Sequence, residues 1–242
     1  MTIDLAPLLQ FFGYGTFDAP FWFIGQEEGT GPDNTRATRL ENYRRRSEQF
    51  TQPTMDLVEA QSILGHAVER NTTPAWRNMA RFTRLVRRGP PLLEKGEVAH
   101  EIPACVGRLQ PRLPRRACFL GEALPIPLKG RGDRLGHQLL QELWGLSHGV
   151  YKRAFLPARA QQWRDLIIHH EPEVVVFYGG GREAASHAFP EGNWQALCRR
   201  EGSTSVEVAP SGATLLFKCH TFANQGVRNW ELMTMAEAIA GR

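Results

Sequence analysis

The apolar run Phe21-Trp22-Phe23-Ile24-Gly25 follows a proline and precedes a polar stretch. An uninterrupted apolar run of so few residues is typical of a β-strand that is covered on both faces. Strands of this kind belong to parallel sheets with helices on either side. The run therefore predicts an α/β fold in which it is an interior strand.

Further runs of the same kind recur along the chain, separated by segments with helical periodicity. The apolar runs are Ala117–Leu120, Val174–Tyr178 and Leu215–Phe217, with a brief alternating segment at Val206 and Val208. Strands that alternate with helices favour a mainly parallel sheet. We expect one domain over residues 1–242, built as a three-layer α/β/α sandwich around a central, mainly parallel four-stranded sheet.

Composition excludes several classes of protein. The longest apolar stretches are far shorter than the roughly 20 residues that span a bilayer, so no membrane partner is expected. Met1–Leu9 lacks the basic flank and apolar core of a signal peptide, which favours a cytoplasmic location. The four cysteines have no Cys-x-x-Cys spacing, and adjacent residues of His169-His170-Glu171 point in different directions on a helix. We therefore expect no metal, no cofactor and no obligate protein partner.

The net charge of +4 is unevenly distributed. The stretch from Arg70 to Arg116 holds eleven Arg or Lys residues against three Glu residues, an excess of +8. Within it, a helix expected from Pro74 carries arginines at three- and four-residue spacing, which are Arg77, Arg81, Arg84 and Arg88. Such a face can bind nucleic acid, although it can equally be a solvated surface in a protein that uses Arg in preference to Lys.

Polar residues follow three of the expected strands. They lie in Gly25 to Gly29, in Gly121-Glu122, and in the segment from His220 to Arg228. Because the carboxyl ends of parallel strands meet at one edge of a sheet, we expect these groups to surround one site, with Glu27, Glu122 and His220 about a single concavity.

These segments resemble motifs of the uracil-DNA glycosylase superfamily. Phe23-Ile24-Gly25-Gln26-Glu27-Glu28-Gly29 is similar to the first motif of that family, and Cys219-His220-Thr221-Phe222-Ala223-Asn224 to the second. The resemblance implies that Glu27 positions a water molecule and that His220 faces the departing base. The residues it implies for substrate binding are Gly25, Gln26, Glu28, Gly121, Glu122, Asn224 and Arg228. It implies DNA, single- or double-stranded, or a nucleotide as the partner.

The resemblance implies metal-independent hydrolysis of the bond between a sugar and a flipped or single-stranded base, either uracil or a modified base. Breaking that bond builds positive charge on the sugar and negative charge on the base. Glu27 would stabilise the first charge and His220 the second. Glu122 or Gly121 stands where the family often presents an amide, and a carboxylate at Glu122 donates to a base carbonyl only when protonated.

Other interpretations remain open at this point. Glu27 and Glu28 can be solvated charges, His220 a hydrogen-bonded histidine at a strand end, and Asn224 and Arg228 residues that shape a loop or cap the last helix. The tryptophans, Trp230 included, are more often core residues than base-stacking platforms. The alternative function is a catalytically inactive nucleic-acid- or nucleotide-binding module on the same fold. A third is an enzyme acting on a free nucleoside or nucleotide.

Overall fold

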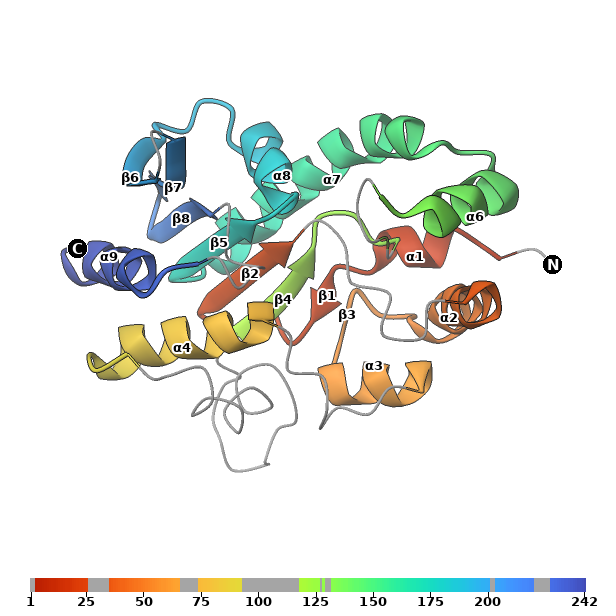
Figure 1. The fold of residues 1–242 in the computed structure, drawn as a ribbon, viewed down its shortest axis with the longest axis horizontal. Helices are drawn as coiled ribbons and strands as arrows, with labels where there is room; N and C mark the ends of the chain where they lie inside the picture. Colours follow the sequence, from red (N-terminus) through yellow and green to blue (C-terminus); the bar gives the residue numbers. More distant parts are fainter. Residues whose placement is uncertain are drawn as a thin grey trace.

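A computed structural model describes residues 3–25, 35–65, 74–92, 118–126, 128, 132–200, 203–219 and 227–242. It is an α/β structure built on one mixed sheet of eight strands in the order β3-β1-β4-β2-β5-β8-β7-β6 (Figure 1). The strands are β1 (Gly13–Tyr14), β2 (Phe21–Gly25), β3 (Thr54–Met55), β4 (Cys118–Glu122), β5 (Val174–Tyr178), β6 (Gln195–Arg200), β7 (Ser203–Ser211) and β8 (Thr214–Cys219).

The centre of the sheet consists of β4, β2, β5 and β8, and each neighbouring pair in this set is parallel. β7 and β6 extend the sheet antiparallel beyond β8, while the two-residue strand β1 pairs antiparallel with β4 and parallel with β3. The sheet is therefore larger than the four strands expected from the sequence. The four apolar runs lie side by side at its middle, so their carboxyl ends share one edge.

Successive residues of β2 face opposite sides of the sheet and enter two separate cores. Phe21 and Phe23 pack in one core with Met79, Phe82 and other residues of α4 (Pro74–Arg88) and α9 (Asn229–Ala240). Trp22 and Ile24 pack in the other core with residues of α6 (Arg134–Trp144), α7 (His148–His170) and α8 (Gly181–Ala188). The first four residues of β2 are fully buried, which is why the run is apolar without alternation. Helices thus cover both faces of the sheet (Figure 1).

Four of the described helices begin at polar caps. The side chains of Thr35, Asp56, Asp133 and Ser147 accept backbone N–H groups at the starts of α2, α3, α6 and α7. The helices are α1 (Ala6–Gln10), α2 (Arg36–Gln49), α3 (Leu57–Leu64), α4 (Pro74–Arg88), α6 (Arg134–Trp144), α7 (His148–His170), α8 (Gly181–Ala188) and α9 (Asn229–Ala240).

Candidate functional site

The carboxyl ends of the four central strands place four residues in one row across the sheet. Gly25 of β2 is paired in register with Glu122 of β4, and Tyr178 of β5 with Cys219 of β8. Ile24 pairs with Phe177, so Gly25 and Tyr178 follow the last registered pair between β2 and β5. In the sequence, the segments that contain Glu27 and His220 follow Gly25 and Cys219 directly.

Tyr178 lies over Gly25 at this edge. A Cβ atom built on Gly25 would come within 2.8 Å of both Cζ and the hydroxyl oxygen of Tyr178, so only glycine leaves room for the ring. Burial raises the pKa of Tyr178, and the nearby charge of Glu122 raises it further. The phenol is therefore neutral and can serve as a hydrogen-bond donor.

Glu122 is a buried carboxyl group at the centre of a polar cluster. Only 4% of the residue is exposed, and its Oε1 lies 3.9 Å from Nη1 of Arg46 on α2. Arg46 also donates to the hydroxyl oxygen of Tyr14 at 3.0 Å. Among the described residues, neither carboxyl oxygen has a hydrogen bond of standard geometry.

Burial is the largest influence on the charge of Glu122. It raises the pKa to about 7, against the opposing effects of Arg46, Arg159 and the adjacent Tyr14 hydroxyl. Near neutral pH the group is therefore present both as a carboxylate, which only accepts hydrogen bonds, and as a carboxylic acid, which also donates one.

Arg159 brings a second buried cation from α7. Its Nη1 donates to the carbonyl of Leu9 at 3.0 Å, its Nη2 donates to the carbonyl of Phe11, and its guanidinium lies 3.6 Å from the ring centroid of Phe12. Burial lowers the pKa of Arg159 to about 10. Two guanidinium groups thus flank one carboxyl group, so the cluster carries excess positive charge.

Other residues expected at the site have different surroundings. A Cβ on Gly121 would lie 2.7 Å from the Trp163 ring, so this glycine permits close packing on the opposite face of the sheet. Arg228 is exposed and precedes α9, where its backbone N–H donates to Glu231 at 2.8 Å, in keeping with the helix-capping interpretation. The residues expected at the site that lie outside the described ranges are Gln26, Glu27, Glu28, His220 and Asn224.

The arginine face of α4 differs from its expected form at one position. Arg81 is only 1% exposed, and its Nη2 donates to Asn229 of α9 at 2.7 Å, because α9 packs beside α4 at this turn. Its assignment to a solvent-facing, nucleic-acid-binding stripe is therefore wrong. Arg77 and Arg84 are partly exposed and Arg88 is exposed, so they keep access to solvent.

Sequence reasoning did not identify four residues of the cluster, namely Tyr14, Arg46, Arg159 and Tyr178. For Tyr178 the sequence contains one indication of a place at the sheet edge, because it is the last residue of an apolar run and is followed by Gly179. Arg46 and Arg159 come from helices, and helical arginines are usually solvated. Nothing in their spacing marks them as buried.

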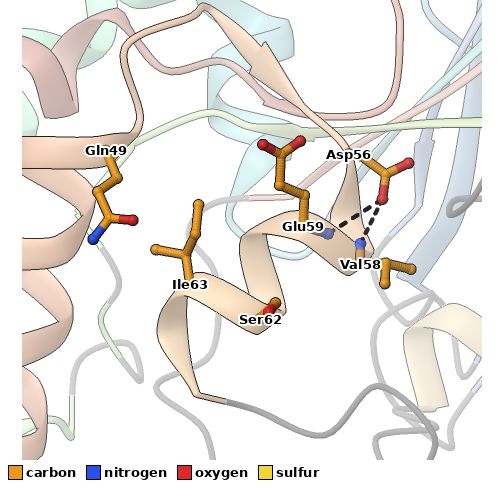
Figure 2. A pocket seen from close by; sticks show the side chains of 6 residues that line it. All are labelled: Gln49, Asp56, Val58, Glu59, Ser62 and Ile63. Carbon is orange, nitrogen blue, oxygen red and sulfur yellow. Dashed lines mark hydrogen bonds between the residues drawn. The ribbon is translucent and has the colours of Figure 1, made fainter.

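A surface pocket of about 620 Å³ lies elsewhere, between the end of α2 and α3 (Figure 2). Asp56 and Glu59 are among its lining residues, but the Asp56 carboxylate accepts the backbone N–H groups of Val58 and Glu59 as the cap of α3. No residue of the strand-edge row lines this pocket. We therefore assign the candidate site to the sheet edge.

Histidines and acidic residues form no metal site within the ranges described above, where no group of three or more potential ligands is found. His170 instead packs against Phe17 and Trp22, with ring centroids 5.1 and 6.0 Å away. Burial lowers its pKa. Across the same ranges, no helix is long and apolar enough to cross a membrane.

Comparison with known proteins provides no family assignment for this chain. No family model matches it, and no curated protein matches it.

Proposed function

We propose that this protein hydrolyses the N-glycosidic bond of a base in nucleic acid and has a fold of the uracil-DNA glycosylase type. The observation that carries the proposal is Glu122, a buried carboxyl group without a standard hydrogen bond among the described residues. It lies beside Gly25 at the carboxyl edge of parallel strands, where ligands of open α/β sheets bind. The first-motif segment with Glu27 continues the chain from that glycine.

Glu122 suits the recognition of a base through its lactam edge, in which an N–H donor stands next to a carbonyl acceptor. A neutral carboxyl group offers one acceptor and one donor, and so complements that edge with two hydrogen bonds. The raised pKa supports this role, because a substantial part of the population is protonated at neutral pH. Glu122 in this proposal is a recognition residue and does not take part in bond cleavage.

The proposed chemistry assigns the two charges of the reaction to the motif residues. Glu27 orients water and stabilises the cationic sugar, and His220 stabilises the departing base. A base in a duplex must first be flipped out of the stack, whereas a single-stranded base avoids that cost.

The test is incubation of the purified protein with single- and double-stranded oligonucleotides that carry a panel of modified bases, scored for released base and abasic sites. Glu27→Gln should slow release while preserving folding and most binding, because it keeps the size of the side chain but removes its charge. Glu28→Gln is the matched control and should have a smaller effect. His220→Ala should slow release on the order of 10²-fold, as expected for loss of a charge-stabilising donor.

Variants of Glu122 test the recognition role separately. Glu122→Gln keeps one donor and one acceptor at every pH, so its substrate affinity should stay constant where that of the wild type falls as the pH rises through about 7. Glu122→Ala should weaken binding across the whole range. Glu142→Gln, on the exposed face of α6, is the control. Identical pH profiles for the wild type and Glu122→Gln would exclude Glu122 from recognition.

A nucleic-acid-binding module without hydrolysis is the second candidate function, supported by the surplus of arginine on and near α4. Wild-type protein that binds the oligonucleotides but releases no base from any of them would favour this function. Base release that is equally fast in wild type and Glu27→Gln would leave a glycosylase whose water-positioning residue is not Glu27.

A further inference from the structure

The first turns of α9 expose two large apolar side chains. Trp230 is 45% exposed and Met233 is 40% exposed, and their three-residue spacing puts them on one face of the helix. In contrast, Trp22 and Trp163 are fully buried. The expectation that Trp230 is a core residue is therefore wrong.

The exposure of Trp230 does not come from a loosely held helix end. Glu231 is fully buried and accepts the backbone N–H of Arg228 at 2.8 Å, while Leu232 and Met235 of the same helix are fully buried in the core. The backbone at Trp230 is thus held firmly while its side chain faces solvent. A rigid aromatic side chain loses little conformational entropy when a ligand stacks on it.

The arginine face of α4 borders this exposed turn. Asn229, the residue before Trp230, accepts a hydrogen bond from Arg81 at 2.7 Å, and α4 and α9 lie side by side along the sheet (Figure 1). Arg77 lies one turn before Arg81 on α4 and Arg84 one turn after it. Arg228 adds an exposed cation at the start of α9.

We propose that Trp230, with Met233, is a stacking site for a base of single-stranded nucleic acid whose phosphates bind the neighbouring arginines of α4. Proteins that bind single strands combine these two elements, an aromatic platform and a cationic track. The inference deepens the proposed function and rests on it for the class of ligand. The proposed binding surface is formed by α4 and α9 and lies outside the two motif segments that contain Glu27 and His220.

The experiment measures the affinity of wild type and variants for a fluorescently labelled single-stranded oligothymidine and for a backbone of the same length made of abasic sugar phosphates. Trp230→Ala should weaken oligothymidine binding about 5- to 100-fold, the range expected for loss of one stacked base. It should leave binding to the abasic backbone unchanged. Trp230→Phe should recover part of the loss, because it restores an aromatic ring.

Ile168→Ala is the matched control, because Ile168 is a 55% exposed apolar residue of α7 on the other layer of the structure. It should bind both oligomers as the wild type does. The slope of affinity against salt should be unchanged in Trp230→Ala, since tryptophan neutralises no phosphate, and should be flatter in Arg77→Gln/Arg84→Gln. Circular dichroism and thermal melting confirm that the variants are folded.

Two results would overturn the stacking site. Equal affinity of wild type and Trp230→Ala for oligothymidine would exclude it, and so would an equal loss on both oligomers. In the second case, a change of oligomeric state in Trp230→Ala would show that the face joins copies of this chain. Base release assays keep the two proposals apart: stacking without release refutes only the enzyme, and release without stacking refutes only this site.

Discussion

At Glu122, burial couples the charge of one side chain to the stability of the whole protein. The pKa is about 7 in the folded chain and 4.5 for an ordinary glutamate, so the folded state binds more protons between these values. The contribution of Glu122 to stability should therefore fall by on the order of 3 kcal/mol as the pH rises from 4.5 to 7 and then level off.

Glu122→Gln should remove this pH dependence, because the amide stays neutral. We expect the variant to match the wild type near pH 4.5 and to exceed its free energy of unfolding above pH 7, as measured by urea denaturation at a series of pH values. A difference between the two proteins that does not change with pH would contradict the prediction.

Gly25 is a second residue at which one atom decides the packing. Gly25→Ala places a methyl group 2.8 Å from the Tyr178 ring, so the ring must move away from the sheet edge. We expect a loss of about 1–3 kcal/mol in the free energy of unfolding, the usual cost of overpacking. The same substitution should cost less in a Tyr178→Leu background, which removes the clashing atoms. Equal costs in both backgrounds would mean that the ring is not the obstacle.

Between elements, a buried ion pair joins α2 to the start of α6. Arg39 donates to Oδ2 of Asp133 at 2.7 Å, and the other oxygen of Asp133 accepts the backbone N–H of Gly136 at 3.1 Å. Both charged side chains are almost completely buried. Removing one partner leaves the other charge uncompensated in the core.

Asp133→Ala should therefore lower the free energy of unfolding by about 3–5 kcal/mol. The double replacement Arg39→Met/Asp133→Leu should recover much of this loss, because it removes both charges and fills the space with apolar atoms. Asp133→Asn keeps an oxygen at the cap of α6 and separates the loss of capping from the loss of charge. Denaturant unfolding measures each variant, and a double variant that is no more stable than Asp133→Ala would contradict the prediction.

The helices and strands also differ in how far their sequences predict them. The helix expected from Pro74 is α4, since its apolar residues recur at helical spacing and Gly89 follows its last residue. By comparison, α7 extends over 23 residues, whereas the clear helical spacing of apolar residues in its sequence is confined to the segment from Trp163 to His170. The two-residue strands β1 and β3 have no periodicity of their own, and they exist through hydrogen bonds to neighbours that are distant in sequence.

Some residues of the candidate site could likewise be predicted from the local sequence, and others could not. Glu122 was predictable because it ends an apolar run, and the end of a buried strand fixes where the next groups lie. The partners Arg46 and Arg159 were not, because only the packing of α2 and α7 against the sheet makes these arginines buried. Local sequence determines which side chain a strand presents, while tertiary packing determines its electrostatic surroundings.

For the molecule as a whole, the sheet should show a gradient of local stability from its centre to its edges. β2 and β5 lie in the middle and their first four residues are fully buried, whereas β6 is an edge strand with exposed residues at Gln195, Ala196 and Arg199. Amide hydrogen exchange should be slowest in β2 and β5 and orders of magnitude faster in β6. Equal protection in β6 and β5 would show that the sheet opens as one unit.

The row of Glu122, Gly25, Tyr178 and Cys219 also dictates when in folding a site at this edge can exist. Neighbours in the row are far apart in the sequence, Tyr178 and Cys219 being the least separated, so each pairing must close a long loop before it gains its hydrogen bonds. No short stretch of the chain contains two residues of this row, so no part of the row can form from local structure alone. After dilution from denaturant, the oligonucleotide binding proposed for this edge should return only with the slowest folding phase, later than the helical signal from α4 or α7.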